Sequence, residues 1–171
     1  MGNDLPGTFI EGLLSGLGHP LIGVDHLAFI VAAGFFLALI PRGLWGVAAL
    51  VAGALGGAAL HLAGIDLPGS EAAVALSVVV IGALVIVGKR IEFHWAMAGL
   101  AIAGLLHGYA YAESIIGAEP TPLAAYLAGF SLIQYAVAST AYFLHRYVPR
   151  QAAMVVGGAV GAIGLVFLVG V

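Results

Sequence analysis

The sequence has no cysteine among its 171 residues, and only 8% of them are charged. Without thiols the chain forms no disulfide and offers no thiolate, so a bound metal must be held by imidazole, carboxylate or backbone oxygen. The five basic residues are scattered, which excludes a basic patch for nucleic acid. A glycine-rich phosphate loop with lysine is also missing, so nucleotide hydrolysis is excluded as the energy source. We expect no enzymatic activity.

Apolar side chains are what the chain has in abundance. Hydrophobic residues make up 63% of it, and the mean hydropathy is +1.15. Soluble domains carry roughly a quarter of charged residues, so this composition is typical of an integral membrane protein. No polar linker divides the chain, and we predict a single all-α transmembrane bundle over residues 1–171.

Apolar runs of about twenty residues, the length that crosses a hydrocarbon core, alternate with short turn-forming or basic segments. Residues 7–18 are too short to cross and are interrupted by glycines, so we predict a short interfacial or partly inserted helical segment there. Ser70 and Thr121 are the predicted N-caps of two of the spans. The six predicted spans are residues 21–40, 44–63, 70–88, 91–114, 121–145 and 151–171.

The basic residues support this count, because all of them fall in alternate loops. By the positive-inside rule these loops are cytoplasmic. Both termini are then predicted to lie outside, together with the acidic residues Asp4, Asp66 and Glu119. The basic residues are Arg42, Lys89, Arg90, Arg146 and Arg150.

Ionisable residues gather at the start of the first predicted span. His19 and His26 are two turns apart on a continuous helix, and Asp25 adds a carboxylate beside them. Two imidazoles and one carboxylate make a partial coordination shell for nickel, cobalt or zinc. Pro20 fits the first turn of a helix or kinks a longer one. The alternative is a buried Asp25–His26 pair without a metal, although ionisable residues inside a membrane usually mark a site or pathway.

Helix rise places further ligands at the same level. Asp25 and His26 lie about 22 Å above the cytoplasmic end of their span, and His107 comes out at the same height. Glu113 and His19 lie nearer the outer surface. Of the remaining histidines, His61 is slightly higher, whereas His94 and His145 belong to the inner end. The predicted metal ligands are His19, Asp25, His26, His107 and Glu113.

Three other features have both a structural and a functional interpretation. Tyr111, one turn from His107, either orients a ligand or belongs to the aromatic belt at the membrane surface. Gln134, near the midplane, either joins helices by hydrogen bonding, which we favour, or lies on a route for the ion. Glycine pairs at four-residue spacing are best explained by close helix packing, and they would also allow a homo-oligomer. These pairs are Gly53 and Gly57, Gly104 and Gly108, and Gly157 and Gly161.

The stretch from His19 to His26, with Gly34 further along, resembles the HPxxGxDH signature of the HupE/UreJ family of nickel or cobalt permeases. This family is associated with hydrogenase and urease gene clusters. Its second segment, rich in histidine and glycine, is matched by residues 107–110. The resemblance extends through Glu113 and Glu119 to most of the chain. Where many members carry a second histidine and then glycine, this sequence has Tyr111 and Ala112.

The resemblance implies import of nickel or cobalt across a bacterial inner (plasma) membrane by a secondary permease or facilitator. Its partners would be the divalent metal ion and the lipid bilayer, with no tightly bound cofactor and no nucleic acid. Two alternatives remain: a haem-binding subunit with His26 and His107 as axial ligands, and a non-transporting accessory subunit. A Soret band would identify the first, and absence of bound metal and of uptake the second.

Overall fold

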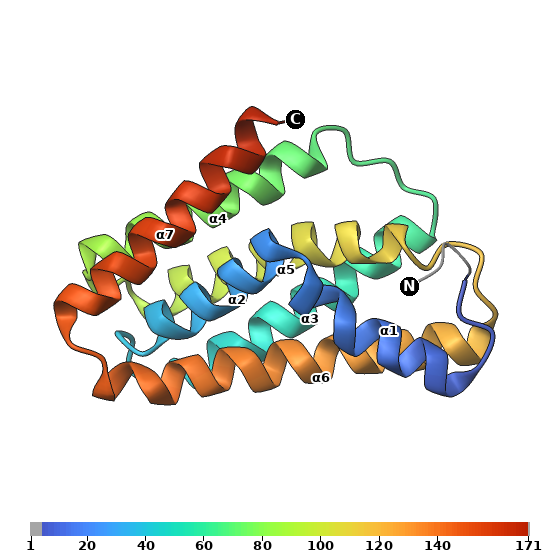
Figure 1. The fold of residues 1–171 in the computed structure, drawn as a ribbon, viewed down its shortest axis with the longest axis horizontal. Helices are drawn as coiled ribbons and strands as arrows, with labels where there is room; N and C mark the ends of the chain where they lie inside the picture. The colour runs from blue at the N-terminus through green and yellow to red at the C-terminus, as the bar shows by residue number, and fades with distance from the viewer. Residues whose placement is uncertain (1–4, 171) are drawn as a thin grey trace.

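The computed structural model of the chain describes residues 5–170 and contains only helices in that range (Figure 1). Residues 1–4 and 171 lie outside this range. The predicted domain includes all of them, Asp4 is one of them, and the last predicted span includes residue 171. The predicted all-α class is confirmed. The helices are α1 (Phe9–Ile22), α2 (Val24–Leu37), α3 (Leu44–Leu62), α4 (Ser70–Val87), α5 (Phe93–Glu113), α6 (Pro120–Leu144), a 3-10 helix (His145–Tyr147) and α7 (Arg150–Val169).

Four of these elements are long and apolar enough to cross a membrane: α3, α4, α6 with its 3-10 extension, and α7. The α1–α2 pair passes the same test as one unit bent by 78°, which gives up to five crossings among the described residues. The 21-residue α5 is not among them, since its histidines, tyrosines and terminal glutamate lower its hydropathy. The chain is thus a multi-pass membrane helical bundle, and the prediction of six spans requires α5 to cross as well.

The first predicted span is not a continuous helix. Gly23 adopts an extended conformation (φ −69°, ψ 105°) that separates α1 from α2. Pro20 therefore lies in the last turn of α1, and His19 is not an N-cap. The position favours glycine, because a Cβ at Gly23 would lie only 2.7 Å from Cδ2 of His26. The prediction that His19 and His26 share a face of one helix is wrong.

The start of α1 is defined by a capping box that the sequence analysis missed. The Glu11 backbone N–H donates to Thr8 Oγ1, and the Glu11 carboxylate accepts from the Thr8 backbone N–H, both at 3.2 Å. This reciprocal pair satisfies two of the free donors at the helix end. Residues 9–22 therefore form a defined helix of their own.

Helices α1 and α2 together follow the length of α6 (Figure 1). A Cβ added at Gly12 would overlap the backbone of Pro122, and one at Gly34 would overlap the carbonyl of Ala138. The α1–α2 pair therefore runs parallel to α6, in the same direction along the bundle. This packing buries Gly12 and Gly16 on one face of α1, whereas Phe9, Ile10 and Leu14 are exposed. The short helical segment predicted at residues 7–18 is therefore present as the first part of α1.

Glycine allows the closest helix contacts. A Cβ at Gly57 of α3 would overlap the carbonyl of Leu105, and one at Gly108 of α5 would overlap the backbone of Ala54. Gly53 and Gly104 make equivalent approaches across the same interface. Between α4 and α7 the close approach is made by Gly82 and Gly157. The packing role predicted for the glycine pairs is confirmed, except that Gly161 has open space where its Cβ would be.

Two predicted helix starts are shifted by a few residues. The N-cap of α4 is Gly69, in the left-handed region at φ 77°, so Ser70 is already helical. The N-cap of α6 is Glu119, and Pro120 takes the first helical position instead of Pro122. Both shifts follow from the turn residues, because glycine adopts positive φ at little cost and proline fits the first turn.

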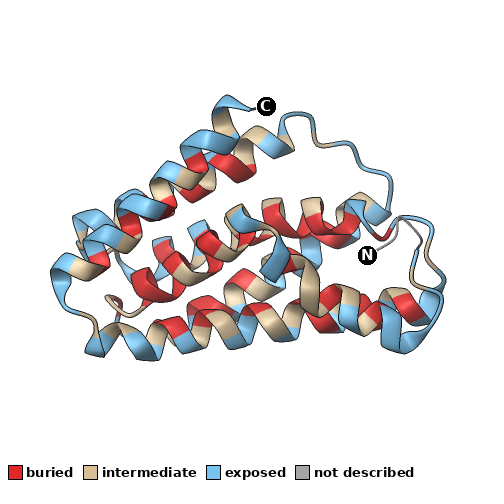
Figure 2. Ribbon diagram, in the orientation of Figure 1, coloured by how far each residue is buried: buried red, intermediate tan, exposed pale blue. Residues whose placement is uncertain are grey.

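Helix α2 is the centre of the molecule, and most of its residues are buried (Figure 2). It dominates the larger apolar cluster, which we call the α2 cluster and which includes Phe29, Ile30, Phe36, Leu37, Val47, Leu50 and Ala138. A second cluster lies towards the end of the bundle that holds His19. This Tyr111 cluster consists of Ala54, Ala58, Tyr111, Ala112, Ile115, Tyr126 and Phe130.

Candidate metal-capture site

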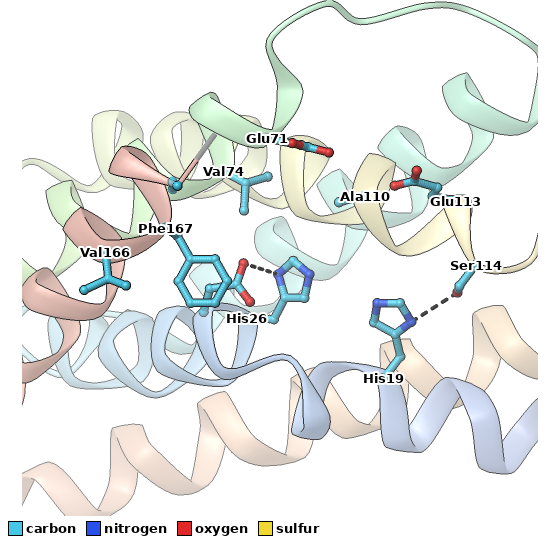
Figure 3. Close-up of a pocket in the computed structure, with 12 residues that line it drawn as sticks. His19, His26, Glu71, Val74, Ala110, Glu113, Ser114, Val166 and Phe167 are labelled. Atoms are coloured by element: carbon cyan, nitrogen blue, oxygen red, sulfur yellow. Dashed lines mark hydrogen bonds and ion pairs between the residues drawn. The ribbon is translucent and has the colours of Figure 1, made fainter. Parts of the chain in front are cut away.

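A cavity of about 620 Å³ opens beside the α1–α2 break. Four of the predicted ligands line it: His19, Asp25, His26 and Glu113. Glu71, in the first turn of α4, lies on the same wall. In Figure 3 the imidazoles of His19 and His26 face the space below Glu71 and Glu113. The cavity therefore combines neutral nitrogen donors with three carboxylates contributed by α2, α4 and α5.

The fifth predicted ligand, His107, lies behind His26. It is 1% exposed, and its Nδ1 is 2.9 Å from Nδ1 of His26. Its Nε2 is 2.9 Å from Ser77 Oγ, and that hydroxyl donates to the carbonyl of Val74. The ring of Phe29 stacks on the imidazole with centroids 4.1 Å apart. His107 is thus held on both nitrogens and on one face.

These contacts define which nitrogens carry protons when both imidazoles are neutral. Ser77 uses its proton for a carbonyl, so it accepts from Nε2–H of His107. Nδ1 of His107 then has a lone pair and accepts from Nδ1–H of His26. Nε2 of His26 is left with a free lone pair, and no hydrogen bond within residues 5–170 occupies it. Asp25 supports this arrangement, with Oδ2 at 3.7 Å from the protonated Nδ1.

His19 is oriented in the same way by different partners. Its Nδ1 is 3.0 Å from the Tyr126 hydroxyl and 3.1 Å from Ser114 Oγ. Both hydroxyls donate to the carbonyl of Tyr111, so the proton between them and His19 belongs to the imidazole. His19 therefore also presents Nε2 as its free lone pair. Metal-binding histidines are commonly fixed through their other nitrogen in this manner.

Tyr111 does not belong to an aromatic belt at the surface. Its side chain is fully buried, and its ring packs against His19 and His26 with centroids 5.2 Å and 4.6 Å apart. Its hydroxyl has no hydrogen-bond partner within residues 5–170. Tyr109 is also buried, and its hydroxyl binds the backbone of Ile65 and Leu67 in the α3–α4 loop. The two tyrosines thus support the site and the adjacent loop.

The predicted ligands are close together without forming a closed coordination shell. The rings of His19 and His26 have centroids 5.9 Å apart. Among residues 5–170, however, no group of three His, Asp or Glu side chains is close enough to hold an ion in this conformation. Side chains would have to rotate into the cavity, which has room for this. The assignment of the five residues as metal ligands remains a prediction.

The other histidines lie elsewhere. His61 packs on Tyr109 and lines a separate cavity of about 380 Å³ by the α3–α4 loop. His94 is exposed at the start of α5, and His145 contacts Phe35 at the opposite end of the bundle. Sequence reasoning missed four residues of the site, because no local pattern marks a side chain supplied by another helix. They are Glu71, Ser77, Ser114 and Tyr126.

Comparisons with known proteins identify a family for this chain. The family described as HupE / UreJ protein matches residues 5–168. The chain is 32% identical over 168 residues to the "Protein HupE" of Rhizobium leguminosarum bv. viciae, covering 96% of this chain and 88% of that protein. No solved structure matches the chain. The family match covers nearly the whole described bundle, including both histidine-containing segments, and the chain therefore belongs to the HupE/UreJ family.

Proposed function

We propose that this protein carries nickel or cobalt ions across the membrane as a secondary permease or facilitator, and that it is not an enzyme. The observation that carries the proposal is the open cavity where the free nitrogens of His19 and His26 lie beside Asp25, Glu71 and Glu113. Imidazole suits nickel, cobalt, copper and zinc, and the carboxylates attract any cation. Family membership favours the first two metals.

The site is suited to capture of an ion from water. An ion that enters an apolar bundle must replace its hydration shell with protein ligands, because unsolvated charge is very costly there. Metal–nitrogen bonds of about 2.0–2.1 Å would allow the two imidazoles to share one ion after small rotations. Rotation of His26 would also release Nδ1 of His107 as a third nitrogen. Half-buried Asp25 and exposed Glu113 would complete the set.

The haem alternative does not fit these residues. Axial ligands must approach an iron from opposite faces of a macrocycle, whereas His26 and His107 are hydrogen-bonded directly to each other. Phe29 stacked on His107 fills the remaining space on one side. The transport experiment decides between a permease and the accessory alternative.

The test is uptake of radiolabelled nickel by cells that express matched amounts of each variant. We expect His26→Ala and Asp25→Asn to reduce uptake to the level of cells without the protein. His94→Ala, an exposed histidine at the other end of α5, and His145→Ala should retain it. Elemental analysis of the purified protein is the companion measurement.

Three outcomes contradict the proposal. Normal uptake by His26→Ala would remove the capture site, and equal loss in all four variants would indicate general destabilisation. A wild-type protein that neither binds nickel or cobalt nor supports uptake would be an accessory subunit.

A further inference from the structure

Gln134 in α6 is a buried polar side chain that has no partner in the part of the chain that the structure describes. It is 0% exposed, and neither its amide oxygen nor its amide nitrogen makes a hydrogen bond among the described residues. A buried amide without partners costs several kcal/mol in an apolar medium, so such a group calls for an explanation. The predicted role in joining helices is wrong, because a side chain that joins helices must be hydrogen-bonded to one of them.

The position of Gln134 is specific. It lies on the buried stripe of α6 in which Tyr126, Phe130 and Ala138 recur at four-residue spacing. Tyr126 and Phe130 belong to the Tyr111 cluster, and Ala138 belongs to the α2 cluster. The amide is therefore located where the two apolar clusters meet.

Other polar groups lie between the cavity and this level of α6. His19 binds the Tyr126 hydroxyl at the cavity wall, and the ring of Tyr111 lies against both His19 and His26. The Tyr111 hydroxyl is also buried and has no partner among the described residues, and the Tyr111 ring packs on Phe130 with centroids 5.4 Å apart. Gln134 follows one turn further along α6, about 12 Å beyond Tyr126 by helix rise.

We propose that the amide of Gln134 is an internal binding point for the partly hydrated cation after it leaves the capture site. This inference rests on the proposed transport function. The amide oxygen would take the ion or a water bound to it, and the amide N–H groups would bind waters that accompany it. Amide oxygen is a weaker ligand than imidazole for nickel or cobalt. A weak site inside the bundle suits transport, because conduction requires that a bound ion can leave again.

If Gln134 binds the ion, its replacement by an apolar residue should lower nickel uptake without lowering thermal stability. Replacement of a structural residue would lower both. Gln134→Leu keeps the bulk of the side chain and removes the unpartnered polar atoms. Purified Gln134→Leu should therefore be at least as resistant to heat as the wild type. Its initial rate of nickel uptake should nevertheless fall by at least about tenfold, the factor that corresponds to about 1.4 kcal/mol in barrier height.

The experiment compares nickel uptake, thermal unfolding and equilibrium nickel binding for the wild type, Gln134→Leu, Gln134→Ala and Gln151→Leu. Gln134→Ala is the second variant in case leucine is too wide for the site. Gln151 is the matched control, since it is exposed in the first turn of α7. We expect unchanged nickel affinity at the capture site in all four proteins, and reduced uptake only when Gln134 is replaced.

Normal uptake by the stable Gln134 variants would overturn the inference and leave the proposed function intact. A parallel loss of thermal stability and uptake would overturn it in favour of a structural role. A wild type without uptake would instead refute the proposed function itself.

Discussion

Two hydroxyls determine how His19 can act. Tyr126 and Ser114 both direct their protons to the Tyr111 carbonyl, so His19 donates from Nδ1 and offers Nε2 to the cavity. The orientation of one candidate ligand therefore depends on side chains from the C-terminal end of α5 and from α6. A residue that never touches the ion can influence its affinity in this way.

We expect Tyr126→Phe to weaken nickel binding by about tenfold to a hundredfold, the usual effect of losing a partner of a metal-binding histidine. The phenyl ring keeps the packing against Phe130, and Ser114 still accepts from His19. Equilibrium dialysis of nickel against the purified protein measures the change.

Tyr135→Phe is the matched control for this prediction, because Tyr135 lies on the exposed side of the same helix, with 47% of its surface accessible. Equal affinities of Tyr126→Phe and wild type would mean that His19 is not oriented through this hydroxyl, or is not a ligand.

At the residue scale, the sequence predicted that ionisable groups would gather at one end of the bundle, and it identified His26 and His107 as neighbours in depth. It could not predict that their Nδ1 atoms are hydrogen-bonded, because they are 81 positions apart in the chain. Nor could it predict that the polar atoms of the Gln134 and Tyr111 side chains are buried without hydrogen bonds among the described residues. Hydropathy locates a polar residue in a span, whereas its hydrogen bonds depend on which helix face meets which neighbour.

At the element scale, the α1–α2 break is the feature that creates the cavity. The chain stays apolar across Gly23, so its hydropathy predicts one straight span there. The capping box at Thr8 is the sequence signal that marks an earlier helix start. The long helices α3, α4, α6 and α7 were predicted to within a few residues, because apolar length, glycine and proline are local signals. Glycine is favoured at the break because the His26 ring, three residues further on, lies against Gly23, and apolar periodicity does not register such a contact.

Gly23→Ala is therefore expected to impair transport. The backbone at Gly23 is in a region that alanine adopts readily, but the added Cβ would push the His26 ring away from its present position. Alanine also favours a continuous helix over the break by roughly 1 kcal/mol. We expect reduced nickel uptake with normal membrane insertion, measured in cells alongside protein level.

Gly18→Ala in α1, five residues before the break, separates this effect from a general one. Its Cβ would lie 3.6 Å from Cδ1 of Ile22, which is an ordinary contact. Should both alanine variants transport normally, the geometry of the break would not matter for function.

At the scale of the whole molecule, the two ends of the bundle differ in chemistry. The cavity, with its histidines and carboxylates, lies at the end where α4 and α6 begin and α5 and α7 finish. At the opposite end Arg150 donates hydrogen bonds to the carbonyls of Val85 and Ile86, which joins α7 to the end of α4. Arg42 lies over the ring of Phe93, 5.6 Å from its centroid. The basic end is thus held together by the residues that the positive-inside rule places in the cytoplasm.

The sequence has no cysteine, so the orientation of the bundle can be tested with single-cysteine variants free of background labelling. We expect Asp66→Cys, exposed in the α3–α4 loop, to react in whole cells with a thiol reagent that does not cross membranes. Glu92→Cys, exposed between α4 and α5, should react only after the membrane is opened. Glu92 is chosen because its replacement keeps Lys89 and Arg90, whose charges set the orientation.

The reverse labelling pattern would place the cavity on the cytoplasmic side. Such an orientation would make the histidine cavity a site of release or export, whereas an outward orientation fits capture of a scarce ion. A third variant tests the span count. If α5 did not cross, the basic residues before α5 and those before α7 would lie on opposite sides of the membrane. A cysteine at Gln151, which is exposed at the start of α7, should therefore be protected in whole cells as Glu92→Cys is. Labelling at that position from outside would show that α5 does not cross.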